Sequence, residues 1–570
     1  MNSAGEPGAV SAGDPCDGGD CGTGSRRRRA TAPRVLSIPA TPRGLRWIPI
    51  AVLAMSLLAV GPSAQQPGPT KDPATALFSG SLLSIAMELS SDSAAGLRAA
   101  PRTYVQARVT VAGQPSWTSV GIKLKGSAGS FQSLDDRPGF TLDLDRFGDA
   151  PEFHGLKKFH LNNGAQDASL LHEWLGAQVF TDAGYPAPRV AHAHVTLDGR
   201  NLGFYVLRES FDSVMESRCF GTAGGNLYDG GFCQDIDADL EKDGGKGPED
   251  RSDLRRLLDA CRTRDAAERR ESLATALDVD ALIDFVALEA MLGHWDGYSL
   301  NRNNYRLCFR STDGRAVFLP HGMDQLFGDA DASILSHPPS IVAGAVLADP
   351  VWRKQYRARI KALLPLFESE RLKARVQSLE RRLVPAMRKL DEDGAREHEG
   401  AVQELLTRIR ARQRSLVAQS TAPDPRPIEF RGSRPVAIKG WHPAGETDGV
   451  ELKKRSIDGA SAYAIACVRD GQQQGAWRTT VLLAEGRYRL VAQVRTQRLK
   501  VEDPEHEGAY LAVDDARSVR IGGDQRWQEI SCEFTVAEPQ RDVELALRVR
   551  AQGGIGGFRV DSLQLVHLED

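Results

Sequence analysis

The chain has 570 residues, which is enough for two or three domains that each bury a core of their own. Lys and Arg total 72 against 75 Asp and Glu, and the formal net charge is -3 at pH 7. This balance gives no overall field that would attract nucleic acid, so we expect no nucleic-acid partner and look for function in local motifs.

The N-terminal residues predict export. Residues 1–46 are rich in Gly, Arg and Pro and poor in large apolar side chains, which is typical of a disordered leader. Residues 48–61 are an uncharged apolar run, too short for a typical membrane span but suited to the core of a signal peptide within residues 47–64. We expect a secreted or envelope-anchored protein, outside the cytoplasm, with cleavage after Ala64. The alternative is an uncleaved membrane anchor.

Six cysteines follow Ala64, and none has the spacing of a zinc site. Cys219 and Cys233 flank a glycine-rich loop, and Cys467 and Cys532 lie in two expected strands. In an oxidising compartment each pair could form a disulfide. Buried free thiols are the alternative in both cases.

We expect residues 65–95 to be a linker and residues 96–418 to form the first folded domain. The N-terminal half of this domain contains five segments in which apolar and polar residues alternate, as in half-buried strands. These segments are residues 105–113, 121–126, 140–147, 190–197 and 203–210. Residues 167–180 instead repeat apolar residues at helical spacing behind an acidic cap, so one helix is expected among the strands.

The second half of this domain is expected to be mostly helical. Residues 278–292 form a predicted helix, a strand pair follows within residues 305–320, and residues 348–418 repeat apolar residues at helical spacing. Part of the charged stretch 234–275 is predicted to be an exposed insertion. A strand-rich half with one helix, followed by a mainly helical half, is the order expected of a small lobe joined to a large lobe. The predicted fold class is α+β.

A second domain is expected at the C-terminus. A Pro-rich linker spans residues 419–435, and residues 436–570 alternate short strand-like segments with Gly, Asp and Pro turns. This pattern is typical of a β-sandwich of the jelly-roll type. Its aromatic residues are predicted to lie in the core; the main ones are Trp441, Tyr463, Trp477, Tyr488, Tyr510 and Trp527. A cell-surface glycan as partner is an alternative that would need exposed aromatic rings.

The motif HWDGYSLN, residues 294–301, carries the chemical prediction. Phosphoryl transfer needs a carboxylate near the acceptor hydroxyl, oxygen ligands for magnesium and a cation on the phosphates. Here Asp296 stands five residues before Asn301, which is the H-x-D-x-x-x-x-N spacing of a phosphotransferase catalytic loop. A second acid, Asp324, follows the predicted strand pair, where a kinase fold has its other metal-binding acid.

Six motifs support a resemblance to a known family. They are KGSAGSF at 125–131, FHGLKKFHLNN at 153–163, GYPAPRVAHAHVTLDGRNLGFYVLRE at 184–209, NLYDGG at 226–231, HWDGYSLNRNNYRL at 294–307 and FLPHGMDQLFGD at 318–329. In this order they resemble the spore-coat CotH kinase family. The resemblance implies an atypical protein-kinase-like, two-lobed domain that uses ATP and Mg2+ to transfer phosphate to protein side chains.

The resemblance also implies catalytic and metal-binding roles for individual residues. Asp296 would be the catalytic aspartate. Asn301 would bind magnesium, with Asn303 or Asn304 as alternatives, and Asp324 would be the main metal carboxylate.

The nucleotide-binding residues implied by the resemblance are Lys125, Gly126, Ser127, Arg137, Glu173 and Glu209. The first three belong to a glycine-rich loop that would cover the phosphates. Arg137, or alternatively Lys123 or Lys125, would hold the phosphates. Glu173 would pair with that cation, and Glu209 would lie near the adenine.

Two departures from the family pattern bear on activity. Gly322 stands where many members have the first of two aspartates, and Arg137 stands where the family has a lysine. We expect an atypical protein kinase that acts on Ser or Thr of a protein substrate of unknown identity. The alternative is a non-catalytic cell-surface protein on a degenerate kinase fold, in which Asp296 and Asn301 only cap their loop and Glu209 only ends a strand.

Overall fold

The structure of the chain is a computed structural model that describes residues 73–79, 82–127, 129–148, 151–444, 449–469 and 471–568. The predicted leader, the signal-peptide core and the cleavage site after Ala64 therefore lie outside the described residues. Within them, no helix is both long and apolar enough to cross a membrane. Helices and strands are mixed along the described chain, which confirms a mixed fold class with strand-rich regions.

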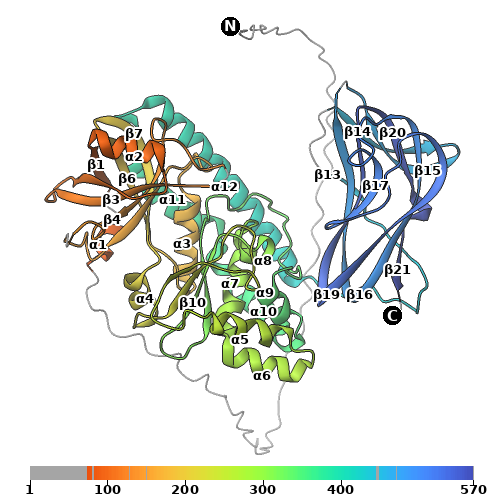
Figure 1. The fold of residues 1–570 in the computed structure, drawn as a ribbon, viewed down its shortest axis with the longest axis horizontal. Coiled ribbons are helices and arrows are strands. Elements are labelled where there is room, and N and C mark those ends of the chain that lie inside the picture. Colours follow the sequence, from red (N-terminus) through yellow and green to blue (C-terminus); the bar gives the residue numbers. More distant parts are fainter. Residues whose placement is uncertain are drawn as a thin grey trace, which may run out of the picture. The chain divides into compact units, whose positions relative to one another are not determined.

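Seven strands form a sheet that closes on itself in the order β1-β2-β3-β4-β5-β7-β6 (Figure 1). They are β1 (Leu83–Leu89), β2 (Val105–Val111), β3 (Trp117–Lys125), β4 (Gly139–Asp143), β5 (Lys158–Asn162), β6 (Val190–Leu197) and β7 (Arg200–Glu209). Neighbouring strands are antiparallel except β1 and β6, whose parallel pairing closes the sheet. Ile122, Phe140, Leu161 and Leu207 are fully buried inside it. Burial of one face fixes the strand register that positions the site.

The segment predicted to be a linker, residues 65–95, contains β1 and the start of the helix α2 (Ser91–Ala99), so this prediction is wrong from residue 83 on. The sequence LSIAMEL alternates, and Ile85 and Met87 are each 1% exposed inside the closed sheet. The short helix α1 (Thr75–Phe78) precedes it.

A second sheet has four strands in the order β11-β10-β8-β9. They are β8 (Asn226–Asp229), β9 (Lys242–Gly244), β10 (Tyr305–Phe309) and β11 (Ala316–Pro320). The α-helices around it are α3 (His172–Asp182), α4 (Ser213–Phe220), α5 (Ser252–Arg262), α6 (Ala266–Ala276), α7 (Val279–Leu292), α8 (Tyr298–Asn301), α9 (Ile341–Leu347), α10 (Pro350–Leu363), α11 (Ser369–Arg388) and α12 (Glu392–Thr421). A short 3-10 helix, Leu364–Phe367, separates α10 from α11. One hydrophobic core joins these helices to the sheet.

Part of the charged stretch 234–275 is exposed, as predicted, since Pro248, Glu249 and Asp250 between β9 and α5 are exposed. From residue 252 on the stretch forms α5 and α6, where Leu254, Leu257 and Leu273 are at most 3% exposed and belong to the main core. Asp253 is also buried, and its carboxylate accepts hydrogen bonds from Asn226 and Tyr228.

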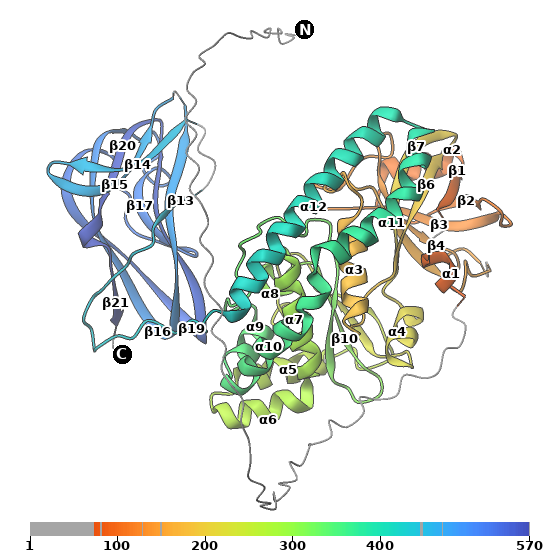
Figure 2. The same ribbon diagram turned by 180° about the vertical axis from the view of Figure 1, so that it is seen from behind.

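The long helices α11 and α12 support α3, which carries Glu173. Figure 2 shows α11 and α12 running side by side. Asp182, at the end of α3, forms ion pairs with Arg371 and Arg375 of α11 at 2.7 and 2.8 Å. These contacts tie the C-terminal end of α3 to α11.

The C-terminal region is strand-rich, as predicted, and its strands form one ten-stranded hydrogen-bonded sheet. They are β12 (Val436–Ala437), β13 (His442–Ala444), β14 (Val450–Ile457), β15 (Ala460–Cys467), β16 (Gln473–Lys500), β17 (Gly508–Val513), β18 (Ala516–Arg517), β19 (Gly523–Ala551), β20 (Gly553–Arg559) and β21 (Gln564–Leu568). Trp441, Trp477, Tyr488 and Tyr510 are at most 7% exposed, so these four rings lie inside, as the sequence predicts. The jelly-roll sandwich remains a prediction.

The described cysteines are free thiols, so neither candidate disulfide is present in the structure. Cys467 and Cys532 are buried in the C-terminal core, and burial raises the pKa of the Cys467 thiol to about 11. Cys233 is exposed and Cys219 is half-buried. Spacing across a glycine-rich loop does not bring two sulfur atoms into bonding geometry by itself.

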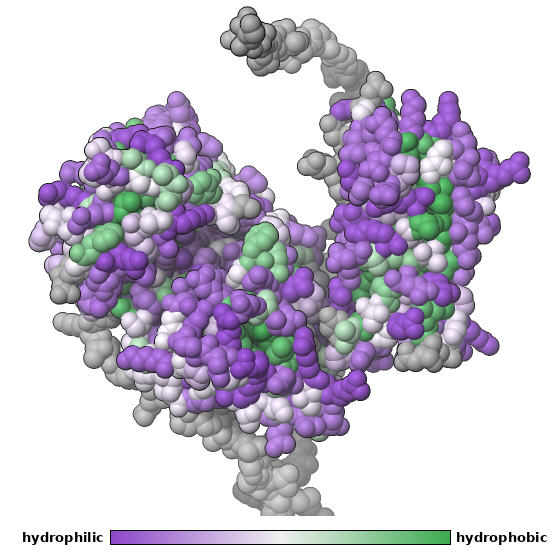
Figure 3. All heavy atoms as spheres, viewed as in Figure 1, coloured by the Kyte–Doolittle hydropathy of each residue, from purple (hydrophilic) through white to green (hydrophobic). Residues whose placement is uncertain are grey.

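The surface seen in Figure 3 is mainly hydrophilic, and its apolar residues lie in small patches separated by hydrophilic ones. Scattered apolar residues of this kind are ordinary on a folded surface.

Candidate functional site

A cavity of about 1710 Å³ brings most of the predicted site residues together. Its lining comes from the closed sheet, α3, the four-stranded sheet and the segment 295–304. The predicted residues that line it are Lys125, Gly126, Ser127, Glu173, Asp296, Asn301 and Asp324. The lining thus combines side chains that are up to two hundred positions apart in the sequence.

A buried carboxylate fixes the loop that carries Asp296. The helix α7 ends at Leu292, and Gly293 turns the chain with a φ of 67°. Glu289 is 1% exposed and accepts hydrogen bonds from the backbone N–H groups of Tyr298 and Ser299, both at 3.0 Å. These two bonds satisfy the free N–H groups at the start of α8 and hold the loop in place.

Three asparagine side chains surround Asp296. Asn304 Nδ2 donates to Asp296 Oδ2 at 2.7 Å, Asn303 Nδ2 donates to the same oxygen at 3.1 Å, and Asn301 Nδ2 donates to Asp296 Oδ1. An ionised carboxylate only accepts hydrogen bonds, so each amide must turn its nitrogen toward Asp296 and its oxygen away. The arrangement orients the carboxylate and leaves the amide oxygen of Asn301 as the atom that it can offer to a metal ion.

Gly322 makes room for Asn304. A Cβ atom added at Gly322 would lie 2.3 Å from Asn304 Oδ1, and the φ of Gly322 is 56°. Both the contact and the left-handed backbone disfavour an ordinary side chain at this position. The absence of an aspartate at position 322 therefore leaves room for Asn304 to contact Asp296.

Lys125 and Glu173 are joined through Asn162. Lys125 Nζ donates to Asn162 Oδ1, and Asn162 Nδ2 donates to Glu173 Oε2 at 2.5 Å. Burial, followed by the positive charge of Arg208, lowers the pKa of Lys125 to about 7. Lys125 is thus a desolvated amine held in the cavity, next to the loop that contains Gly126 and Ser127.

Asp324 is the acid of the second predicted motif, and it lies in a poorly solvated part of the cavity. Burial, followed by the negative charge of Glu173, raises the pKa of Asp324 to about 6. A cation nearby would favour the ionised form. The carboxylate is therefore placed where a bound metal ion would compensate an existing electrostatic penalty.

The role predicted for Arg137 is wrong, because its side chain is used elsewhere. Arg137 Nη2 donates to the backbone oxygen of Phe204 at 2.5 Å, and the guanidinium lies 5.2 Å from the centre of the Tyr205 ring. Arg137 is not among the residues that line the cavity. Lys123 and Lys125, the two predicted alternatives, both line it.

The role predicted for Glu209 is also wrong. Its side chain is fully buried and forms ion pairs with Arg189 and Arg218 at 2.7 and 2.6 Å. Side chains alternate along a strand, so the residues on either side of it, Arg208 and Ser210, line the cavity while Glu209 points to the opposite face.

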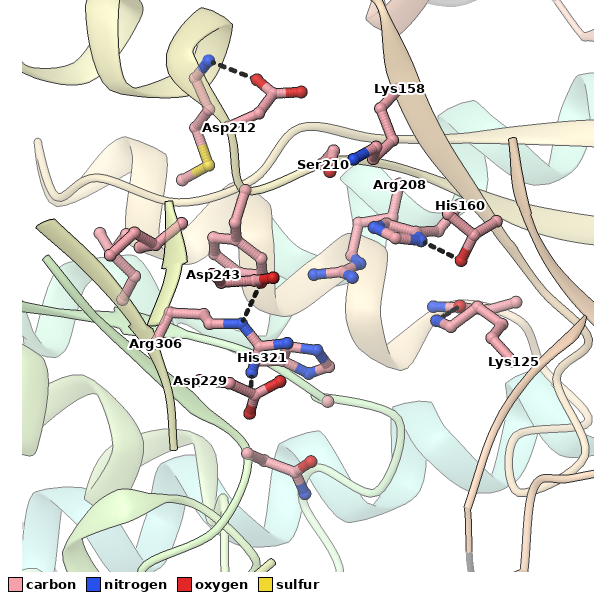
Figure 4. A pocket seen from close by; sticks show the side chains of 18 of the residues that line it. Lys125, Lys158, His160, Arg208, Ser210, Asp212, Asp229, Asp243, Arg306 and His321 are labelled. Carbon is pink, nitrogen blue, oxygen red and sulfur yellow. Dashed lines mark hydrogen bonds and ion pairs between the residues drawn. The ribbon is translucent and has the colours of Figure 1, made fainter. Parts of the chain in front are cut away.

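Arg208 and Arg306 are cavity residues that the sequence reasoning missed. Figure 4 shows Arg208 between Lys125 and Arg306, with His321 beside Arg306. Arg208 is 2% exposed, and its Nε lies 3.4 Å from Glu173 Oε1. Burial lowers the pKa of Arg208 to about 10. The available signal was a charged residue inside an otherwise apolar strand, GFYVLRES.

The oxygen donors and the cations of the cavity fit magnesium and phosphate, respectively. Among the described residues there is no cluster of three or more His, Cys, Asp or Glu side chains that could hold a metal ion. Magnesium takes one or two carboxylates and keeps several waters, so Asp324 and the amide oxygen of Asn301 are a suitable donor set. Lys125, Arg208 and Arg306 provide positive charge for phosphate groups.

Comparisons with known proteins agree with the sequence resemblance. Residues 122–416 match the family model described as CotH kinase protein. The chain is 23% identical over 260 residues to the inner spore coat protein H of Bacillus subtilis (strain 168), a match that covers 41% of this chain and 69% of that protein.

Among solved structures, the proinflammatory kinase CtkA of Helicobacter pylori is 12% identical with a TM-score of 0.25, and the match covers 50% of this chain and 95% of that chain. TmCBM61, solved in complex with beta-1,4-galactotriose, is 17% identical with a TM-score of 0.17, and the match covers 24% of this chain and 91% of that chain.

Proposed function

The chain belongs to the CotH kinase protein family, and on this premise we propose that it is an atypical protein kinase with a two-lobed catalytic domain. It transfers the terminal phosphoryl group of ATP to a Ser or Thr hydroxyl of a protein, with Mg2+ as cofactor. The observation that supports this most directly is Asp296, held by three asparagine amides in the same cavity as Lys125, Glu173 and Asp324.

In the proposed reaction Asp296 orients the acceptor hydroxyl and takes its proton. A bond forms between the hydroxyl oxygen and the terminal phosphorus, and the bond from that phosphorus to the ADP oxygen breaks. The proton passes from Asp296 to solvent, and ADP leaves. Most of the catalysis in such a transfer is positioning and charge neutralisation, which a fixed carboxylate in a cavity can provide.

The remaining residues bind and orient the donor. Asn301 and Asp324 would hold magnesium, which neutralises phosphate charge when bound. Lys125 is kept in place by Asn162 and Glu173, as described above. Gly126 has a φ of 112°, and a Cβ there would lie 2.9 Å from the backbone of Phe131, so the loop needs glycine to stay compact beside the phosphates.

The proposal is tested with the purified full-length chain, labelled ATP, magnesium and a Ser-rich acceptor peptide. Labelled acceptor is expected from the wild type, and Asp296→Asn should reduce the rate by about 100-fold or more because the acceptor loses its base. Asp239→Asn is the matched control, since Asp239 lines the same cavity but its side chain is 83% exposed and paired with Arg251. Equal inactivity of wild type and Asp296→Asn, with no binding of magnesium and ATP, would contradict the proposal.

We also propose that the protein acts outside the cytoplasm, in the envelope or the medium. The support is the apolar run at residues 48–61 behind a cluster of arginines. Immunoblots of cytoplasm, envelope and medium test this; detection in the cytoplasm alone would count against it.

A further inference from the structure

Arg208 has more hydrogen-bond donors than its described surroundings satisfy. Its Nε and Nη1 atoms are buried and have no hydrogen-bond partner among the described residues. The ion-pair contact of Nε with Glu173 at 3.4 Å is longer than a normal charge-assisted hydrogen bond. Buried donors without a partner are rare and costly, so each such group needs an explanation.

Arg306 brings a second guanidinium to the same place. Arg306 Nη1 pairs with Asp229 at 2.7 Å, while its Nε is buried without a hydrogen-bond partner among the described residues and lies 3.8 Å from Asp243. The guanidinium carbons of Arg208 and Arg306 lie 4.9 and 5.5 Å from the centre of the same Phe211 ring. Both cations therefore lie against the same ring, and the charge of Arg306 adds to burial in lowering the pKa of Arg208.

Arg208 lies among both acids and cations. Burial lowers the pKa of Arg208, the charge of Glu173 raises it, and the charge of Arg306 lowers it. His321, which stacks on Phe211 at 5.5 Å with an interplanar angle of 14°, has a pKa held well below its usual value by burial and by Arg208, Arg306 and Lys125. These three cations therefore act on one buried imidazole, beside the two Arg208 nitrogen atoms that have no partner among the described residues.

We infer that Arg208 and Arg306 form a subsite for the phosphate chain of the donor, and that this subsite binds phosphate directly, without a metal ion. The inference rests on the proposed function and deepens it. Guanidinium groups present planar pairs of N–H donors that match the oxygens of a phosphate group. A phosphate between the two arginines would satisfy the free donors and relieve their mutual repulsion.

The subsite has a consequence for the class of donor. Phosphate recognition by Arg208 and Arg306 does not involve the base, and His321 already covers one face of the Phe211 ring. Inorganic tripolyphosphate should therefore compete with ATP for the cavity, because it presents the same phosphate oxygens without a base. Phosphate-carrying compounds as a class, rather than adenine compounds alone, are the ligands of this subsite.

The test uses the full-length protein in EDTA, with inorganic tripolyphosphate as the probe in calorimetric titrations. The wild type should bind it, and Arg208→Gln should weaken binding by about tenfold or more because the hydrogen bonds involve charged groups. Arg208→Lys keeps the charge without the planar fork and should give an intermediate loss. Arg200→Gln is the matched control from the same strand; Arg200 donates to the backbone oxygens of Leu134 and Asp136, and its loss should leave binding within about twofold.

The outcomes separate the two proposals. Absence of tripolyphosphate binding by the wild type, or unchanged binding by folded Arg208→Gln and Arg208→Lys, would overturn the phosphate subsite even if phosphate transfer from ATP is observed. Binding that depends on Arg208, in a protein that transfers no phosphate, would support the subsite and overturn the proposed function. Competition by adenosine but not by tripolyphosphate would also overturn the subsite.

Discussion

Replacing Gly322 by alanine should displace Asn304 from Asp296. The added Cβ would lie 2.3 Å from Asn304 Oδ1, well inside van der Waals contact. Asn304 would then lose its hydrogen bonds to the carboxylate of Asp296 at 2.7 Å and to the backbone oxygen of Asp296 at 3.1 Å. The substitution therefore acts on Asp296 through a neighbour, without touching it.

The size of the effect can be divided into two parts. A left-handed φ costs an L residue about 1 to 2 kcal/mol. The loss of two hydrogen bonds, one of them to a charged group, adds about 2 kcal/mol. We expect Gly322→Ala to lower the free energy of unfolding by about 3 kcal/mol in the wild type but by only about 1 kcal/mol when Asn304 is already alanine.

A double-mutant cycle measures this coupling. Urea unfolding of wild type, Gly322→Ala, Asn304→Ala and the double variant gives the four free energies. Gly184→Ala is the matched control, because Gly184 has a φ of 77° and a Cβ there would meet no atom within 4 Å. A coupling energy below about 0.5 kcal/mol would refute the link between Gly322 and Asn304, because independent sites add within that limit.

Three further results are expected. Arg137→Gln should leave the affinity for ATP within about twofold, since Arg137 binds the Phe204 backbone outside the cavity lining. A titration with magnesium and ATP checks this, and a tenfold loss of affinity would contradict it. Asp324→Ala should abolish the rise in melting temperature that magnesium and ATP give the wild type, without lowering the melting temperature of the free protein at pH 7.5. The reason is that the pKa of Asp324 is raised from 3.8 to about 6, so its contribution to stability falls as pH rises between these values and is unfavourable above them. The pKa of Lys125 falls from 10.5 in the unfolded chain to about 7 in the folded protein, so between these values the unfolded state holds the extra proton and the free energy of unfolding should rise with pH. Lys125→Met should lose that part of the rise in urea titrations from pH 6.5 to 9.5. An identical pH dependence in wild type and variant would refute this.

The predicted site residues that do line the cavity are those whose positions follow from local spacing in the sequence. Asp296 and Asn301 belong to one turn of chain between α7 and β10, so their separation in the sequence nearly fixes their separation in space. Lys125, Gly126 and Ser127 form a similar local unit at the end of β3. A motif of this kind can be recognised without knowing how the sheets pack.

The predictions that failed concern residues whose role depends on which face of a strand they occupy. Glu209 and Arg208 are adjacent in the sequence, and the strand-like pattern does not show which of them faces a cavity and which faces Arg189 and Arg218. Arg306, like Arg208, is a charged residue inside an apolar strand, but its place in the cavity arises from the meeting of β10 with Phe211, which follows β7. The linker prediction failed for a related reason, because β1 is held in the closed sheet by pairing with β6, which lies far along the chain.

Three neutral asparagines around Asp296, rather than charged side chains, suit the charges that the cavity already contains. A lysine in one of these positions would add to the field of Arg208, Arg306 and Lys125, which already lowers the pKa of His321. An acid would add to the field of Glu173 that raises the pKa of Asp324. Neutral amides hold Asp296 by hydrogen bonds without changing either field. Arg208 pairs with Glu173 at 3.4 Å, so a substitution at Asp324 should remove metal binding while Arg208 still binds phosphate.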